Sequence, residues 1–191
     1  VVKRIKTDLI KLNNSNIKKL LNEDNLNYKY SDINKKYVNC TKTRFISNNN
    51  QIFRYDNKKS NKIKYKKLQE NFKLCLKENK IDLIILSDYN LDLLTTNFTR
   101  FIIKNNNNIP IFSDPRINNI YKFKDTMLLK PNRAEYYEIC NKLNLKNEIN
   151  KNNLEIICRK LNILFIFLSL DKEGLLYFNS ITNTINKTSY Y

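Results

Sequence analysis

The fold class follows from residues 126–135, Thr-Met-Leu-Leu-Lys-Pro-Asn-Arg-Ala-Glu, in which a short, largely apolar run passes directly into the start of a helix. The apolar spacing from Tyr136 to Leu143 predicts that this helix continues. Asn132 is a favoured N-cap residue, and Glu135, three residues later, completes a capping-box-like pair. A strand that leads into a helix is the repeating unit of an α/β protein, and ligands bind at such junctions.

Strand and helix patterns alternate on both sides of this junction. Strands are expected at residues 81–86, 109–112, 126–129 and 163–168, and helices at residues 17–22, 62–79, 95–104, from 133 onward, and near 153–161. The run 81–86 is almost continuously apolar, as buried parallel strands are. This order predicts a largely parallel sheet with helices on both faces.

Other strands are expected outside this alternation. Residues 38–47 and 51–55 alternate polar and apolar side chains and are joined by three asparagines, which predicts a β-hairpin near the N-terminus. Gly174 permits a turn before two final strands, at 175–178 and 181–187. No repeat or linker interrupts the pattern, so one domain is expected.

The net charge is high but dispersed. Lys and Arg number 35 against 18 Asp and Glu, and a net charge of +17 ordinarily suggests nucleic acid or an anionic membrane as partner. The lysines are scattered among many Asn and Ile residues, and AT-rich codons encode all three types. We therefore attribute the charge to an AT-biased genome and expect neither partner; a coding region of ordinary base composition would contradict this.

Cysteine usage and hydropathy indicate a cytoplasmic protein. The four cysteines are widely separated and mostly lie in apolar-periodic segments, so they are expected as small core residues in a reducing compartment: Cys40, Cys75, Cys140 and Cys158. No Cys-x-x-Cys pair and no His occur, which argues against a structural metal site. The longest apolar run, 163–168, is too short to span a bilayer, and the N-terminus does not resemble a signal peptide.

Polar residues follow four successive expected strands. They are Asp88, Asp114, Asn132 and Ser169. A single polar residue at a strand end is usually a cap or turn former. Four of them at the carboxyl edge of one sheet, where ligands bind, favour a functional crevice instead.

Read in order, several short runs resemble those of the ribokinase-type (pfkB) sugar kinases. They are Lys42-Thr43-Arg44 with Gln51 and Arg54-Tyr55-Asp56, Ser87-Asp88-Tyr89 with Leu94-Thr95, Asp114-Pro115-Arg116, and Pro131-Asn132-Arg133-Ala134-Glu135. Within that family they are most similar to the kinase half of the bifunctional heptose-7-phosphate kinases and heptose-1-phosphate adenylyltransferases of lipopolysaccharide core synthesis. The resemblance implies a ribokinase-like fold and ATP-dependent phosphorylation of the anomeric hydroxyl of a sugar phosphate.

The resemblance also implies a nucleotide site. Asn132, Arg133, Ala134 and Glu135 would bind ATP, with Glu135 holding Mg²⁺ through water. A carboxylate that holds hydrated Mg²⁺ is one of the parts that phosphoryl transfer requires. Ser169 and Gly174 would form a turn against the nucleotide, although an ordinary turn between two strands explains these two residues equally well.

Two residues would lie on the sugar-phosphate side. They are Arg44 and Asp88, and an Arg suits this role because it can donate two parallel hydrogen bonds to a phosphate. An exposed strand residue is the alternative interpretation of Arg44. Arg116 is interpreted as an exposed turn residue, and phosphate binding is the alternative interpretation. The implied small-molecule partners are thus ATP, Mg²⁺ and a sugar phosphate.

The sequence departs from the family pattern in four respects. Asn90-Leu91-Asp92 stands where the family has Gly-Lys-Gly, and Asp171 stands where the nucleotide turn has its first Gly. The Gly-Ala-Gly-Asp motif, whose Asp is the general base of the family, does not occur in residues 1–191, and neither does the Gly-rich sugar-binding segment. We therefore expect a partial kinase domain that does not turn over by itself.

Alternatives remain open at this stage. A non-catalytic relative that retains nucleotide or partner binding is one, and a basic nucleic-acid-binding domain is another, ranked last because the charge is dispersed. Within the kinase class, ribose, fructose or adenosine could replace heptose. A homodimer is one hypothesis for the oligomeric state.

Overall fold

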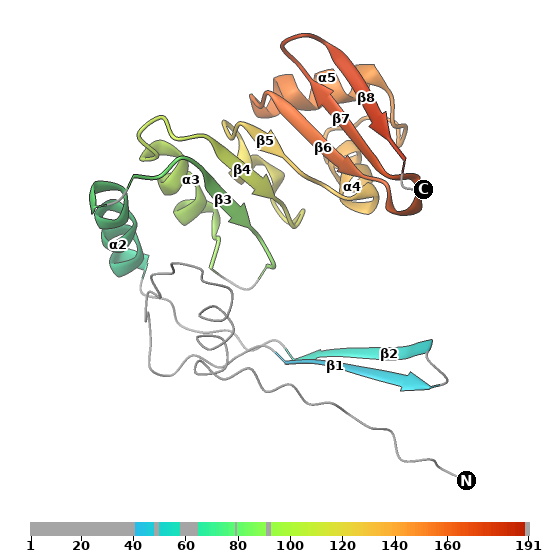
Figure 1. Cartoon of the computed structure of the whole chain (residues 1–191), viewed down its shortest axis with the longest axis horizontal. Coiled ribbons are helices and arrows are strands. Elements are labelled where there is room, and N and C mark those ends of the chain that lie inside the picture. The colour runs from blue at the N-terminus through green and yellow to red at the C-terminus, as the bar shows by residue number, and fades with distance from the viewer. Residues whose placement is uncertain (1–40, 48–49, 58–64, 79, 91–92, 190–191) are drawn as a thin grey trace. The chain divides into compact units, whose positions relative to one another are not determined.

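The computed structural model describes residues 41–47, 50–57, 65–78, 80–90 and 93–189 (Figure 1). The chain divides into two compact units, Val1–Lys64 and Tyr65–Tyr191, and each is described by itself. The helix expected at residues 17–22 lies outside the described residues.

The first unit contains the expected β-hairpin. Strands β1 (Thr41–Ser47) and β2 (Asn50–Asn57) pair antiparallel, with a register shift after Phe45. Phe45 lies opposite Phe53, and their ring centroids are 5.7 Å apart. The hairpin prediction is confirmed for these residues, because alternation and cross-strand aromatic pairs favour a ribbon of this kind.

The second unit is built on one six-stranded sheet. Its strands follow in chain order across the sheet: β3 (Ile84–Ser87), β4 (Ile111–Asp114), β5 (Leu128–Leu129), β6 (Phe165–Ser169), β7 (Leu175–Asn179) and β8 (Thr184–Thr188). The first four are parallel, and β7 and β8 are antiparallel to their neighbours. The prediction of a largely parallel α/β sheet is confirmed.

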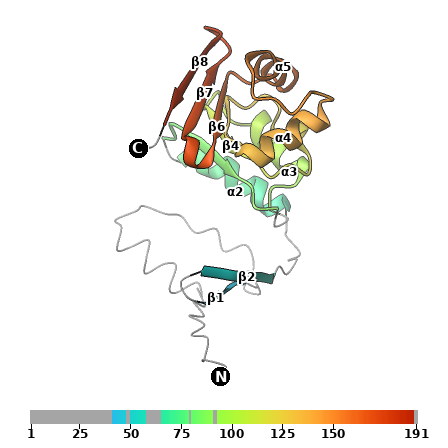
Figure 2. The ribbon, with the colours of Figure 1, turned by 90° about the vertical axis from the view of Figure 1, so that its right-hand side faces the viewer.

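Four α-helices accompany this sheet. They are α2 (Tyr65–Glu78), α3 (Thr96–Lys104), α4 (Arg133–Lys142) and α5 (Lys151–Leu161), with short 3₁₀ turns η1 (Ile120–Phe123) and η2 (Asp171–Glu173). Figure 2 shows α3, α4 and α5 on the same side of the sheet, and α2 packs beside α3 through Phe72 and Phe101. Helices were expected on both faces, and among the described residues of this unit the second face has none.

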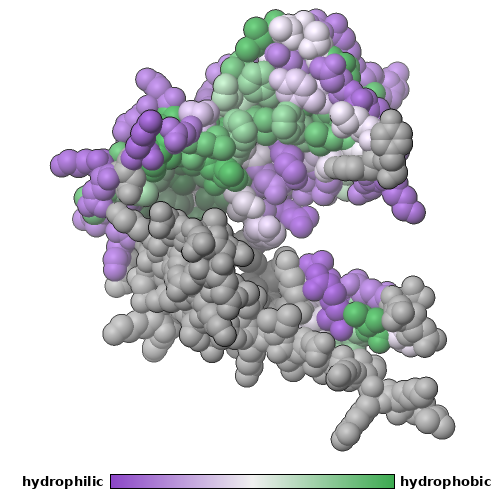
Figure 3. Space-filling model, viewed as in Figure 1, coloured by the Kyte–Doolittle hydropathy of each residue, from purple (hydrophilic) through white to green (hydrophobic). Residues whose placement is uncertain are grey.

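The face of the sheet that carries no described helix is apolar. The register aligns Ile85, Phe112, Leu128 and Phe165 in one row across the four parallel strands, and Figure 3 shows a hydrophobic band over this face. The expectation that the run 81–86 is a buried strand is wrong, since β3 lies at the edge of the sheet that the described residues form and Ile85 is 67% exposed. A continuous apolar run identified a parallel strand but not its place in the sheet.

Asparagine and aspartate supply the left-handed backbone positions of this chain. Eight described residues other than glycine have positive φ: Asn90, Asn107, Asn108, Asp125, Asn144, Asn162, Asp171 and Asn183. These two residue types tolerate the left-handed region best after Gly, and the chain contains only one Gly. In the described asparagine run 105–108, Asn107 and Asn108 take these positions in the turn that follows α3.

The cysteines behave as core residues. Cys140 and Cys158 are buried and Cys75 is half-buried, while Cys40 lies outside the described residues. Burial raises the pKa of the Cys158 thiol to about 12. Within the described residues, no helix has the length and apolar character to cross a membrane.

Candidate functional site

The carboxyl ends of the parallel strands meet at one edge of the sheet. The backbone N–H of Asp88 donates to the carbonyl of Asp114 at 2.9 Å, which joins the ends of β3 and β4. Asn132 and Ser169 form an isolated parallel bridge, which joins the ends of β5 and β6. The four polar residues that follow the expected strands therefore lie along one edge, where an open α/β sheet binds ligands.

Asn132 and Glu135 form a complete capping box at the start of α4. The Glu135 N–H donates to Asn132 Oδ1 at 2.9 Å, and the Asn132 N–H donates to Glu135 Oε2 at 2.9 Å. The capping-box prediction is confirmed. The second carboxylate oxygen, Oε1, takes no part in the cap and lies 3.4 Å from Nη1 of Arg116. One oxygen of Glu135 thus stabilises the helix while the other faces a cation.

More cations lie around this helix start. Lys130 Nζ is 3.4 Å from Asp114 Oδ1, and Arg133 pairs with Glu173, which Lys187 also reaches at 3.3 Å. The Lys187 hydrogen bond and the Arg133 charge hold the pKa of the Glu173 carboxyl below its usual value. Every cation here has a carboxylate partner, and each of these pairs is exposed enough to exchange for a phosphate.

The turn between β6 and β7 has a structural explanation of its own. Gly174 has φ of +93°, and a Cβ placed there would lie 1.8 Å from the carbonyl oxygen of Thr188. The Ser169 hydroxyl faces the Pro131 carbonyl at 3.4 Å. Asp171 has φ of +51°, in the left-handed region that Gly adopts most readily and Asp tolerates.

Asp88 is placed inside the protein. Its side chain is 3% exposed and accepts a hydrogen bond from Lys122 Nζ at 2.5 Å. Its other oxygen accepts from the Asn90 N–H at 2.8 Å. Sequence reasoning missed Lys122, because one lysine among many scattered ones carries no local signal.

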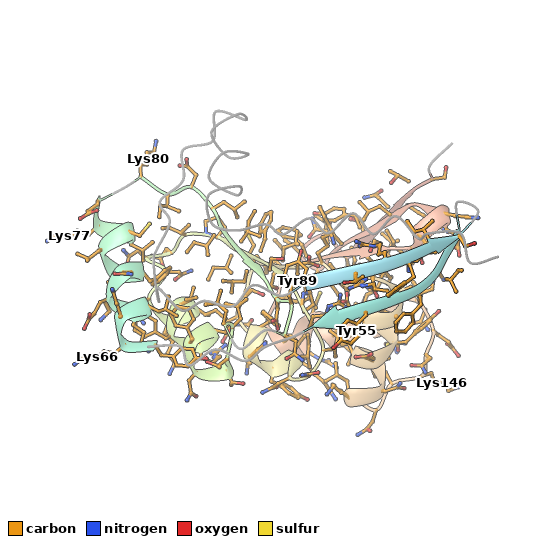
Figure 4. All side chains as sticks on the ribbon, turned by 90° about the horizontal axis from the view of Figure 1, so that it is seen from below. Tyr55, Lys66, Lys77, Lys80, Tyr89 and Lys146 are labelled. Carbon is orange, nitrogen blue, oxygen red and sulfur yellow. The ribbon has the colours of Figure 1, made fainter. Side chains whose placement is uncertain are left out.

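Of the expected site residues, the structure brings together Ser169 and the start of α4, whereas the Asp88 side chain faces Lys122 inside the protein. Asn132, Arg133, exposed Ala134 and buried Glu135 form the first turn of α4, and Ser169 lies beside Asn132. Arg44 is exposed on β1, directly opposite Arg54 on β2, in the other unit. Figure 4 shows Lys66 and Lys77 projecting from the two ends of α2, and Lys146 from the segment between α4 and α5, in keeping with dispersed charge.

The donor set fits magnesium only in its hydrated form. Among the described residues, no three carboxylates, histidines or cysteines gather to hold a metal ion. Mg²⁺ commonly keeps several waters and takes one or two carboxylates plus the phosphates of its substrate. Glu135 Oε1 supplies one such carboxylate, and the cations Arg116, Lys130 and Arg133 suit phosphates.

Comparisons with known proteins place this geometry in context. The family model described as pfkB family carbohydrate kinase matches residues 11–189. The bifunctional protein HldE of Aliarcobacter butzleri is 31% identical over 144 residues, and that of Nitratiruptor sp. 30% over 140 residues. Each alignment covers 72% of this chain but only 30% and 29% of the relative, so the chain spans about a third of the length of these relatives.

A solved structure shares the fold. The tetrameric inhibited form of phosphofructokinase-2 from Escherichia coli aligns with a TM-score of 0.64 and 14% identity. The alignment covers 92% of this chain and 58% of that one. At this identity the likeness concerns the ribokinase-like fold alone.

Proposed function

The chain belongs to the pfkB family of carbohydrate kinases, and from this premise we propose that it is part of an ATP-dependent sugar kinase whose nucleotide segment is Asn132 to Glu135. The observation that carries the proposal is the divided role of Glu135. Its Oε2 accepts from the Asn132 N–H, whereas Oε1 lies beside Arg116 at the carboxyl edge of the sheet. A carboxylate used only as a cap has no need of this second partner.

The surrounding charges suit a polyphosphate. A helix N-terminus attracts anions, and α4 begins at that edge with Arg133 in its first turn. Hydrated Mg²⁺, when bound, neutralises the charge that develops on the transferred phosphoryl group. Glu135 would hold its water shell, while Arg116 and Arg133 would exchange their carboxylate partners for phosphate oxygens. Ser169 and Gly174 are proposed to contribute the turn that lies against the nucleotide.

The proposed acceptor is a sugar phosphate, with heptose 7-phosphate first among the candidates. This choice rests on the resemblance of the short motifs to heptose-7-phosphate kinases, which place Arg44 and Asp88 on the sugar-phosphate side. Ribose, fructose or adenosine is the alternative within the same family. Arg44 is exposed on its strand and free of burial constraints, as a phosphate ligand would be.

We expect residues 1–191 alone to bind nucleotide without turning over. Gly174 is the only glycine, so no Gly-Ala-Gly-Asp motif exists within them to supply a general base and backbone amides. Incubation of the purified chain with ATP, Mg²⁺ and heptose 7-phosphate should yield no sugar bisphosphate. Transfer of phosphate would contradict this expectation.

Nucleotide binding is tested by calorimetric titration with ADP, with and without Mg²⁺. Glu135→Gln keeps a side-chain acceptor for the capping box but removes the charge. We expect Mg²⁺ to tighten ADP binding in the wild-type chain and this gain to fall by about tenfold in the variant, as for removal of a metal-orienting group. Glu138→Gln is the matched control, because Glu138 is exposed on the same helix.

Two results would overturn the proposal. One is an equal Mg²⁺-dependent gain in Glu135→Gln, Glu138→Gln and the wild-type chain. The other is no nucleotide binding by a correctly folded wild-type chain. A non-catalytic relative is the alternative, and the negative charge of Asp171 in the proposed phosphate turn is the observation that supports it. It would be favoured if a longer parent protein that contains the Gly-Ala-Gly-Asp motif binds nucleotide but shows no sugar-dependent turnover.

A further inference from the structure

One ion pair at the carboxyl edge of the sheet joins a fixed carboxylate to an exposed cation. Nη1 of Arg116 lies 3.4 Å from Oε1 of Glu135, and the two side chains are 55% and 11% exposed. The Asn132 N–H donates to the other carboxylate oxygen of Glu135, Oε2, at 2.9 Å. The capping box therefore fixes the carboxylate, whereas the guanidinium group lies mostly in solvent and is the member of the pair that can leave.

The backbone around Arg116 is anchored to α4, the helix that carries Glu135. Ile117, directly after Arg116, is buried. The Arg116 carbonyl accepts from the Asn118 N–H at 3.0 Å, and the Asn118 carbonyl accepts from Lys142 Nζ, in the last turn of α4, at 3.0 Å. The side chain of Arg116 therefore moves about a backbone that is held beside α4, and it stays near Glu135 when it leaves the carboxylate.

Arg116 and a metal ion would compete for the same oxygen. Among the described residues, Glu135 forms its ion pair with Arg116, while the neighbouring cations Lys130 and Arg133 pair with other carboxylates. An exposed ion pair contributes little free energy, so this one exchanges readily. Hydrated Mg²⁺ takes one or two carboxylates, and two cations beside one oxygen repel each other. Arg116 therefore weakens the binding of Mg²⁺ at Glu135 for as long as it remains there.

A bound nucleotide would remove this competition. Phosphate oxygens offer the Arg116 guanidinium another partner, to which it can donate two parallel hydrogen bonds. Glu135 then becomes available to the water shell of Mg²⁺. With phosphate present, Arg116 and the metal ion no longer exclude each other, because both neutralise the same polyphosphate.

We propose that Arg116 couples metal binding to nucleotide binding. It neutralises Glu135 when no nucleotide is bound, and it yields this carboxylate to hydrated Mg²⁺ when phosphate oxygens take up its guanidinium group. The part of the nucleotide in this coupling rests on the proposed function, whereas the competition between Arg116 and Mg²⁺ needs only the two side chains. Mg²⁺ alone then binds weakly, and Mg²⁺ and ADP raise each other's affinity by the same factor.

The competition is tested on the full chain without nucleotide. Arg116→Met removes the charge and keeps the apolar stem of the side chain. We expect this variant to bind Mg²⁺ about fivefold more tightly than the wild-type chain, the upper range for an exposed ion pair. Titration with magnesium chloride, followed through the amide resonances of Asn132 and Glu135, measures the affinity. Arg159→Met is the matched control, because Arg159 is exposed on α5 and its loss changes the net charge equally.

Two further measurements test the route of the coupling. The gain in Mg²⁺ affinity should vanish when Glu135→Gln is added to Arg116→Met, because the oxygen for which both cations compete has then lost its charge. Calorimetric titration with ADP gives the factor by which Mg²⁺ tightens nucleotide binding. We expect this factor to fall by about fivefold in Arg116→Met and to stay unchanged in Arg159→Met.

The outcomes separate the coupling from the proposed function. Equal Mg²⁺ affinity of the wild-type chain and Arg116→Met would overturn the inference, and so would an equal gain in Arg159→Met, which would reflect net charge alone. A gain that persists after Glu135→Gln is added, or an unchanged effect of Mg²⁺ on ADP affinity in Arg116→Met, would overturn it as well. If the wild-type chain binds no ADP while Arg116→Met alone gains affinity for Mg²⁺, the competition for Glu135 is upheld and the proposed nucleotide site is contradicted.

Discussion

Replacement of Gly174 by Ala is expected to destabilise the second unit strongly. Gly174 has φ of +93°, a region that L side chains rarely adopt. An added Cβ would lie 1.8 Å from the Thr188 carbonyl oxygen and 2.9 Å from Ser189 Cα, both backbone atoms. The chain's single glycine thus lies where two backbones come together, and no rotation of a side chain relieves the clash.

The size of the loss in unfolding free energy follows from this geometry. A non-glycine residue held at such a φ costs about 1 to 3 kcal/mol. Ordinary contact begins at 3.4 Å, so the end of β8 must retreat by about 1.6 Å, which is possible because this exposed strand forms the edge of the sheet. Loss of the last β7–β8 hydrogen bonds adds about 1 kcal/mol each. A total of about 3 kcal/mol lowers the melting temperature by roughly 10 °C in a domain of this size.

Thermal unfolding followed by far-ultraviolet circular dichroism measures this effect. The matched control is Asp171→Gly, in the same turn, where φ of +51° suits glycine, so the variant should melt close to the wild-type chain. At low temperature, hydrogen exchange should show that only the amides of β7 and β8 lose protection in Gly174→Ala. A Gly174→Ala chain that melts like the wild type would refute the close approach of the turn to Thr188.

Three further predictions concern other parts of the chain. Asn144, which follows α4, has φ of +57°. Asn144→Ala should therefore lower the free energy of unfolding by about 1 kcal/mol in chemical denaturation, whereas Asn144→Gly should be close to neutral. Equal stability of both variants and the wild-type chain would contradict this. Lys187 and Arg133 lower the pKa of Glu173 below its ordinary 4.5. The ionised Glu173 carboxylate therefore stabilises the folded chain at pH above 4.5, and this stabilisation is lost as the pH falls through the lowered pKa of the folded state. Glu173→Gln should therefore show a small loss of melting temperature at neutral pH that vanishes in acid, and a loss that persists in acid would count against the ion pairs. Burial raises the pKa of Cys158 to about 12, so this thiol should resist a thiol reagent at neutral pH until the chain unfolds, and rapid labelling of the native chain would contradict its burial.

The candidate site was only partly predictable. Asn132 and Glu135 were found from sequence because a capping box is local: both partners lie within four residues, and the spacing alone allows the reciprocal hydrogen bonds. Lys122 could not be found, since its partner Asp88 lies 34 residues away and lysine is abundant throughout the chain. The same holds for Arg116, which reaches Glu135 only because the ends of β4 and β5 are adjacent.

Local patterns by themselves determined the class of fold and the order of its elements. Apolar runs and capping residues act over a few residues, so they set where each strand and helix forms, and asparagine and aspartate supply the positive φ that turns require. Tertiary structure alone decided that β3 lies at the edge of the described sheet, that α3, α4 and α5 share one face, and that Asp88 is turned inward to Lys122. These features depend on contacts between segments that are far apart in the sequence. A short stretch of sequence does not determine the free energy of such contacts.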